Sequence, residues 1–490
     1  MPSYKLQGTD RADGDQTGMN HTLSLASEQP TNSGWLWRIL LIAVGGFALG
    51  LRLYYVTHVV MFQPANQRGA SGNAVQYYNY ARNLVQHGIY SADPIGTMHP
   101  VGDSFRDPGY PVFLAAWMEI FPHWDSWYAA VLFSQAFLGA ATVVLWLCAI
   151  HRRMPLGWLA AAGILMAIWP HSIAMISHLL SETLYGFLVA LAMFAFSICM
   201  EKPTARHGVV SGLCFSMAAL TNGVLLPFAA LLITYMLIRR RIPARVALAL
   251  IMTTACLTIP WMVRNHMQQA NQPSSTDRAL MNLVEGSWPP YHSADMASII
   301  SHEPRATLIM EQINQEIVVI EANHLAGISM VLQRVTQRPG YYIRWYLQKP
   351  ILLWGWSIRI GVGDIYVYVT YHSPFDTNPI WRAIEALCHS LNPFLMLLAL
   401  IACSLALLQK RQLQKKQNQE LESIALLLIF VTVVHTALQA EPRYSIPYRG
   451  AEIVLGMFAV YWLRTYIPKL RAHSHNHEQN TVTRAPSTNE

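Results

Sequence analysis

The sequence predicts an all-α, polytopic membrane protein. Of its 490 residues, 53% are hydrophobic and 12% are charged, whereas a soluble domain carries about 25% charged residues. The apolar residues gather in runs long enough to cross a hydrocarbon core of about 30 Å, which takes about 20 residues of helix. The chain also has 15 Trp and 22 Tyr, many of them near the ends of these runs, as an interfacial aromatic belt requires.

Apolar segments of spanning length predict about ten transmembrane helices. One segment, 208–237, is too long for a single helix and carries Asn222-Gly223 in its middle, so it predicts two helices joined by a tight turn. With that hairpin counted as two, the predicted spans are 36–60, 127–150, 156–176, 180–200, 208–237, 246–263, 392–408, 424–438 and 446–466.

These spans divide the chain into two membrane regions and two long loops. The first membrane region covers residues 35–265 and includes a first loop at 61–110. A large loop at 266–390 separates it from the second membrane region at 391–468. The large loop has no convincing span, and its first part is polar with helical periodicity.

The distribution of Lys and Arg predicts the orientation of the bundle. Ten spans place every basic turn on one side, and the positive-inside rule makes that side the cytoplasm. The polar tails, 1–34 and 469–490, are predicted to be disordered on the same side. Both long loops then face outward, and the net charge of +7 reflects topology rather than a nucleic-acid-binding face. The basic turns lie at 152–153, 202–206, 239–245, 410–416 and 464–471.

The first loop contains an amphipathic helix that is suited to the membrane surface. Asn73 and Gln76 at its start predict a capping box, and Gly88 predicts its end. A second short helix is predicted at 111–121. The apolar residues of the first helix recur at three- and four-residue spacing and share one face: Ala74, Tyr77, Tyr78, Ala81, Leu84 and Val85.

Ionisable side chains gather at four places on the outer side, where charges at a helix mouth indicate function. Arginine binds phosphate through two parallel hydrogen bonds, and a carboxylate can accept a proton or hold a divalent cation. Together they predict a site for an anionic, lipid-linked substrate. The four groups are Arg106-Asp107 with Tyr110, Glu182, Arg264-Asn265, and Glu441 with Arg443-Tyr444.

The order of these groups resembles that of GT-C fold glycosyltransferases, of the dolichyl-phosphate-mannose–protein mannosyltransferase and aminoarabinose lipid A transferase kind. The resemblance covers about residues 36–265 and 392–466. It implies a multi-pass protein of the bacterial inner membrane that moves a sugar from a polyprenyl-phosphate carrier to an envelope glycan, lipid or protein, on the periplasmic or extracellular side. The motifs are NAVQYYNYARNLVQHGIY, RDPGYPVFLA, LLSETLYGFL, IPWMVRN and EPRYSIP.

The resemblance places a catalytic carboxylate at position 73, where this chain has Asn73, with Tyr77 and Ala81 following in register. An amide takes up no proton near neutral pH and cannot act as a general base. Three explanations remain open. Asp103 or Asp107 takes over the role, or an acceptor that is already anionic needs no base, or the chain has lost transfer activity.

Glu182 resembles the acidic residue of the family's second outer loop, which implies contact with the acceptor or with a divalent metal cation. The alternative is that Ser181 or Glu182 only caps the next helix. Tyr77 and Tyr110 belong to the first-loop motifs and are implied to contact substrate.

Arg443, with Tyr444 beside it, resembles a ligand of the carrier phosphate, and Arg264 and Arg106 are further phosphate ligands in this reading. The alternatives are structural. Arg443 could snorkel to the headgroups, Arg264 could form a turn at a helix exit, and Arg106 could pair only with the adjacent Asp107.

A second class of function is a non-catalytic protein that binds or transports a lipid-linked sugar, which Asn73 favours. Transporters usually show internal repeats and charges at mid-membrane, and the sequence has neither. An enzyme that ligates surface polysaccharide would share the topology but should not need the RDPGYP and EPRY motifs.

Overall fold

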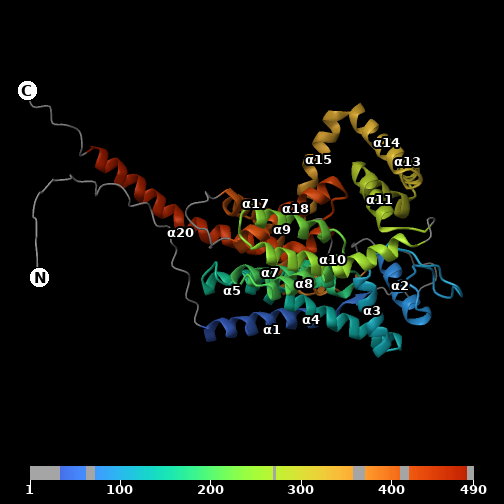
Figure 1. Cartoon of the computed structure of the whole chain (residues 1–490), viewed down its shortest axis with the longest axis horizontal. Helices are drawn as coiled ribbons and strands as arrows, with labels where there is room; N and C mark the ends of the chain where they lie inside the picture. Colours follow the sequence, from blue (N-terminus) through green and yellow to red (C-terminus); the bar gives the residue numbers. More distant parts are fainter. Residues whose placement is uncertain (1–33, 62–71, 269–271, 357–369, 409–418, 483–490) are drawn as a thin grey trace, which may run out of the picture.

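The computed structural model describes residues 34–61, 72–268, 272–356, 370–408 and 419–482. Across these ranges the chain is helical, apart from one short antiparallel pair of strands, β1 (Val60–Met61) and β2 (Thr370–Tyr371). Long helices lie side by side in a bundle, and a group of outer helices projects from one side near one end (Figure 1). The all-α fold that the composition predicts is thus confirmed.

Six helices are long and apolar enough to cross a membrane within the described ranges. A further candidate consists of α5 (Leu156–Ala167) and the segment from Pro170 to Ser177, which meet at 55° and form either a broken span or a re-entrant loop. Pro170 interrupts the helix at the bend. The six are α1 (Gly34–His58), α4 (Trp124–Ile150), α7 (Glu182–Glu201), α10 (Ala244–His266), α17 (Pro379–Leu408) and α18 (Gln419–Ala437).

The three other predicted spans are present as helices of different length. α8 (Ala205–Thr221) and α9 (Leu225–Ile238) have 17 and 14 residues, fewer than the about 20 of a full span, and they meet at the predicted turn around Asn222. α20 (Arg449–Val482) contains the last predicted span and continues beyond the bundle (Figure 1). α17 begins at Pro379, 13 residues before the predicted start of its span at residue 392.

Small residues let the bundle helices approach closely, as is typical of packing in lipid. On α8, a Cβ added at Gly208 would lie 2.8 Å from the Val246 carbonyl oxygen of α10. One added at Gly212 would lie 2.7 Å from the carbonyl oxygen of Leu250. α7 lies at the centre of the bundle and is mostly buried, so the residue that begins it is held rigidly at the outer mouth.

The first loop forms two helices, α2 (Asn73–His87) and α3 (Gly109–Ile120), which lie together at one end of the bundle (Figure 1). Gly88 ends α2 in a left-handed conformation with φ of 66°, as predicted. The predicted capping box is wrong: residue 72 is the N-cap and makes no side-chain cap hydrogen bond. The side chains of Asn73 and Gln76 bind Arg106 instead.

The large loop folds into a layer of helices with its own apolar core. Ser274 and Asp277 form a capping box that starts the first of these helices. The buried side chains of Val284, Ile313 and Ile320 hold the layer together. Its helices are α11 (Ser275–Ser287), α12 (Tyr291–Met296), α13 (Pro304–Ala322), α14 (His324–Gln337) and α15 (Pro339–Leu353). The remaining short helices are α6 (Pro170–Ala174), α16 (Pro374–Thr377) and α19 (Pro442–Ser445).

Candidate active site

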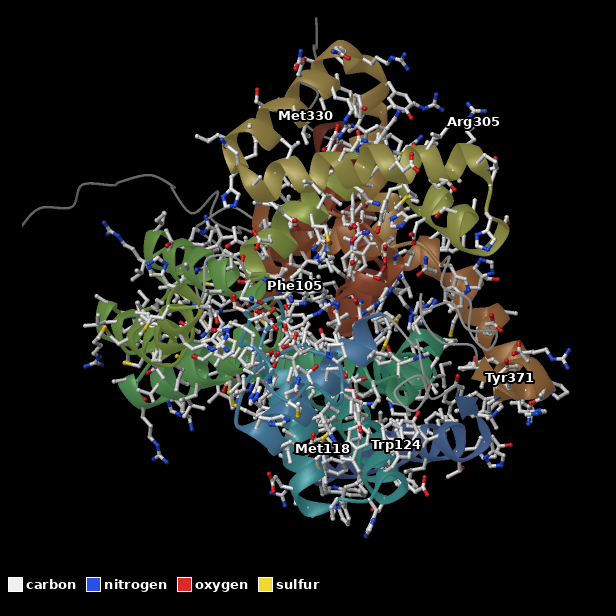
Figure 2. The ribbon with its side chains drawn as sticks, turned by 90° about the vertical axis from the view of Figure 1, so that its right-hand side faces the viewer. Phe105, Met118, Trp124, Arg305, Met330 and Tyr371 are labelled. Atoms are coloured by element: carbon white, nitrogen blue, oxygen red, sulfur yellow. The ribbon has the colours of Figure 1, made fainter. Side chains whose placement is uncertain are left out.

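A cavity of about 660 Å³ lies where the two outer loops meet the mouth of the bundle. Figure 2 places Phe105, which lines it, between the bundle and the outer helices that carry Arg305 and Met330. Its charged and amide-bearing lining comes from both loops, from the start of α7, from the turn between α8 and α9 and from the turn between α18 and α20. Those residues include Asn73, Arg106, Asp107, Glu182, Asn222, Arg278, Glu285, Glu441 and Arg443.

A buried ion pair joins Glu182 and Arg443 across the floor of the cavity. Glu182 is the first residue of α7 and Arg443 lies in α19, and the Arg443 Nε atom is 2.5 Å from Glu182 Oε1. Arg443 is 6% exposed, so it does not snorkel to the headgroups. Ser181 makes no side-chain cap hydrogen bond; its hydroxyl accepts one from Tyr77 at 3.2 Å. Arg443 is thus buried rather than snorkelling, whereas Glu182 both pairs with it and lies in the first turn of α7.

The second oxygen of the Glu182 carboxylate has no hydrogen-bond partner in the described part of the chain, and it is buried. An unpartnered buried carboxylate oxygen is costly, so this atom marks a place where a substrate hydroxyl can donate. Tyr444, next to Arg443, also lines the cavity, and its hydroxyl donates to Gln439 Oε1 at 2.8 Å.

Arg106 is held by two neutral amides rather than by an acid. Its guanidinium donates to Gln76 Oε1 at 2.6 and 2.9 Å and to Asn73 Oδ1 at 2.5 Å. It does not pair with the adjacent Asp107, and no carboxylate of the described residues lies within ion-pair distance of it. The guanidinium also lies over the Tyr77 ring, 5.3 Å from its centroid. Its positive charge is thus oriented but not neutralised.

Asp107 instead ties the two outer loops together. Arg278 of α11 reaches its carboxylate at 2.6 Å, and the backbone N–H of Gly223, in the turn between α8 and α9, donates to it at 3.2 Å. Arg278 also lies over the Phe105 ring at 6.0 Å. No motif of the sequence singles out Arg278, because its role arises from contact between segments far apart in the chain.

Asp103 does not line the cavity. Its buried carboxylate accepts hydrogen bonds from the Tyr80 hydroxyl and from the backbone N–H groups of Ala92 and Phe105, the latter two at 2.8 and 3.0 Å. These bonds shape the first loop, so the geometry makes Asp103 a support for the site rather than part of its surface.

Arg264 and Tyr110 lie behind the cavity wall as well. Arg264 donates to the backbone carbonyls of Asp103 and Tyr90, the second at 3.2 Å. The Tyr110 hydroxyl donates to Gln135 Oε1 at 2.9 Å. Of the residues that the sequence nominates, the structure therefore brings nine to the cavity: Asn73, Tyr77, Arg106, Asp107, Glu182, Asn265, Glu441, Arg443 and Tyr444.

The large loop contributes acidic and aromatic groups that the sequence does not nominate. Glu285 of α11 is 9% exposed, and the Tyr291 hydroxyl lies near enough to stabilise the charged form of its carboxyl. Burial raises the pKa of Glu285 to about 7, with a smaller rise from Asp295 and an opposing effect of the Tyr291 hydrogen bond. The Trp-Pro-Pro-Tyr turn before α12 is the sequence feature that points to this region.

His292 follows Tyr291 and faces the turn that carries Arg443. Its Nδ1 atom is 3.2 Å from Glu441 Oε1, and burial lowers the pKa of His292 to about 4. The imidazole is therefore neutral at pH 7, so it leaves the negative charge of the Glu441 carboxylate in place.

The donor set does not fit a divalent cation. Across the described ranges, no three His, Cys, Asp or Glu side chains converge as a metal site. Asp107 and Glu182, the carboxylates best placed to contribute, already face arginines. The sequence suggests a divalent cation at Glu182, but the described residues offer no second ligand for it there.

The arrangement of the helices matches solved membrane proteins. An oligosaccharyltransferase of Archaeoglobus fulgidus, tethered with an acceptor peptide, matches with a TM-score of 0.50 at 12% identity. The match covers 90% of this chain and 51% of that chain, so this chain spans about half its length. ArnT of Cupriavidus metallidurans, bound to undecaprenyl phosphate, matches with a TM-score of 0.37 at 15% identity, over 86% of this chain and 77% of ArnT.

No family model matches the sequence, and a comparison with curated proteins finds no relative. At such low identity, the archaeal structure is informative about the fold alone. That fold is the GT-C fold of polytopic membrane glycosyltransferases, as the five sequence motifs predict.

Proposed function

We propose that this protein is a glycosyltransferase that moves a sugar from a polyprenyl-phosphate carrier to an envelope glycan, lipid or protein. In this proposal it lies in the bacterial cytoplasmic membrane with its cavity on the periplasmic or extracellular side. The observation that carries the proposal is Arg106, an oriented cation without an acidic partner, lining a cavity at the bundle mouth. A carrier phosphate is the anion that a lipid-facing GT-C fold would bring there.

The chemistry of transfer follows from the charges around the cavity. The acceptor oxygen forms a bond to the anomeric carbon, and the bond from that carbon to the carrier phosphate oxygen breaks. The departing phosphate gains negative charge, which Arg106 stabilises from a fixed position. Arg443 lines the same cavity, but the buried Glu182 carboxylate balances its charge, so Arg106 is the main stabilising cation.

This reading also gives Asn73 a role that an aspartate could not fill. Asn73 accepts a hydrogen bond from Arg106 and orients it without cancelling its charge. An Asp at this position would form an ion pair with Arg106 and weaken its hold on phosphate. We therefore assign Asn73 as a positioning residue of the anion site.

The second candidate is a protein that binds or moves a lipid-linked sugar without transfer. Asn73 favours this candidate as well. It stands where the resembled family has its catalytic acid, and its amide cannot accept a proton. Both candidates require the carrier phosphate to bind at Arg106, and only the first requires release of the sugar.

Turnover separates the two candidates. The full chain in lipid nanodiscs is supplied with a panel of radiolabelled undecaprenyl-phosphate sugars and an envelope extract, and release or transfer of the label is measured. The proposal expects transfer with at least one donor and its loss in Arg106→Gln. Arg305→Ala, on the exposed surface of α13, is the matched control and keeps full activity. Saturable carrier binding without any release would favour the binding protein.

A further inference from the structure

We infer that Glu285, on the large outer loop, accepts the proton of the acceptor hydroxyl during transfer. The inference rests on the proposed transferase function and names a base that the first-loop motif lacks. Glu285 lines the same cavity as Arg106 and Arg443, so the anion site and this carboxylate open onto one space.

The fold holds Glu285 in a fixed position at the end of α11. The next residue, Gly286, packs so closely on the backbone that an added Cβ would lie 2.0 Å from the Leu438 carbonyl oxygen. Lys349 Nζ and Trp345 Nε1 each donate to the Gly286 carbonyl at 2.9 Å. These contacts lock α11 onto the turn that follows α18. A proton acceptor must be positioned in this way to reach its substrate.

Glu285 differs from the other acids of the cavity in having no basic partner among the described residues. A carboxylate in an ion pair is a poor proton acceptor, because the adjacent cation stabilises its charged form. Three further carboxylates line the cavity. Asp107 pairs with Arg278 and Glu182 pairs with Arg443. Glu441 faces the neutral ring of His292, and its charge also interacts with that of Arg443.

The surroundings of Glu285 raise its pKa to about 7, close to neutral pH. Burial and the nearby Asp295 of α12 raise the pKa of Glu285, and the Tyr291 hydroxyl stabilises its charged form. The two cations packed nearby are occupied: Lys349 and Arg334 bind carbonyl oxygens of the residues that follow Glu285. A base works best when its pKa lies near the working pH, and at pH 7 a carboxyl of this kind is present in both forms.

Proton transfer to Glu285 accompanies formation of the new glycosidic bond. The acceptor hydroxyl loses its proton to a Glu285 carboxylate oxygen while its own oxygen bonds to the anomeric carbon. The bond from that carbon to the carrier phosphate oxygen breaks, and the electron pair leaves with the phosphate. The protonated Glu285 then returns its proton to the departing phosphate or to solvent, and no other reactant is needed.

The test compares initial transfer rates in nanodiscs for wild type, Glu285→Gln, Glu285→Asp and Arg305→Ala, between pH 5 and 9. Arg305 is exposed on α13 and does not line the cavity. The inference expects Glu285→Gln to lower kcat by about 10²- to 10⁴-fold, the usual contribution of a general base. It expects kcat of the wild type to rise with pH through about 7, that rise to vanish in Glu285→Gln, and Arg305→Ala to stay within a few-fold of wild type.

Binding of undecaprenyl phosphate to each variant checks that the site is folded, and Glu285→Gln should bind it as wild type does. A Glu285→Gln rate close to wild type, or a lower rate with an unchanged pH profile, overturns the assignment of Glu285 and leaves the proposed function standing. Absence of transfer by wild type with every donor overturns the proposed function and this inference with it.

Discussion

The two outer loops contribute to one cavity but differ in how the sequence reveals them. The first loop carries recognisable motifs, and its helix α2 places Asn73 and Tyr77 on the cavity wall. The large loop carries no motif, yet its helix α11 supplies Arg278 and Glu285 to the same cavity. Local patterns thus identify the side of the cavity where we propose anion binding and miss the side formed by the large loop.

The largest expected effect is on stability and concerns the buried pair of Glu182 and Arg443 on the floor of the cavity, beneath both loops. Arg443→Ala leaves the Glu182 carboxylate buried without its partner, and breaking one side of a buried pair costs about 3–5 kcal/mol. Thermal unfolding in nanodiscs should show a large loss of stability. A change below about 1 kcal/mol would contradict the buried pair, since exposed pairs contribute only that much.

The second-largest expected effect concerns the large loop and is seen in how the free energy of unfolding depends on pH. The pKa of Glu285 rises from 4.5 to about 7 on folding, so the folded state binds the proton more tightly than the unfolded state. The stability that this proton contributes is present at low pH and is lost as pH rises from about 4.5 to about 7. At about 1.4 kcal/mol per pKa unit, wild type should lose up to about 3 kcal/mol relative to Glu285→Gln. Parallel stability curves for the two would refute the shifted pKa.

The first loop is tested by carrier binding. Arg106→Gln removes a charged donor from the cavity, and a hydrogen bond to a charged group contributes about 1.5–3 kcal/mol, so affinity for undecaprenyl phosphate should fall by about tenfold to a hundredfold. Asn73→Asp should also weaken binding, because it neutralises Arg106. Tighter binding in Asn73→Asp would disprove the positioning role, and Arg305→Ala serves again as the control.

The smallest effect concerns the contact between the loops. Arg278→Ala removes the ion pair with Asp107, whose partners are less than one-fifth exposed, and should cost about 1–2 kcal/mol. Hydrogen exchange of α11 and of the α8–α9 turn should rise together, because Asp107 also accepts the Gly223 N–H. Exchange confined to α11 would show that the loops are not coupled.

Most of the fold could be predicted because apolar runs of spanning length determine it. The bundle helices, the end of α2 at Gly88 and the turn at Asn222 all follow from local sequence. The site could be predicted only in part. Asn73 and Gln76 have a capping-box spacing, but Arg106, 30 residues or more away in the chain, competes for their oxygens. Such competition depends on tertiary contacts, which local patterns do not contain.

Tertiary contacts also explain why the structure differs from the sequence prediction at Asp103, Arg264 and Glu285. Asp103 and Arg264 resemble site residues because they are charged and close to the motifs. In the structure Asp103 accepts from the Tyr80 hydroxyl and from two backbone N–H groups, and Arg264 donates to two backbone carbonyls. No spacing rule identifies these partners. Glu285 lies in a polar helix like many others, and only its packing against the α18 turn makes it unusual.

The most direct test of the central claim is single-turnover transfer from a radiolabelled undecaprenyl-phosphate sugar by wild type and Asn73→Asp. The account predicts transfer by wild type and slower transfer by Asn73→Asp, because the new carboxylate neutralises the Arg106 charge that binds the carrier phosphate. Transfer by Asn73→Asp alone would contradict it, since the natural protein would then be a binding protein that lacks its catalytic acid.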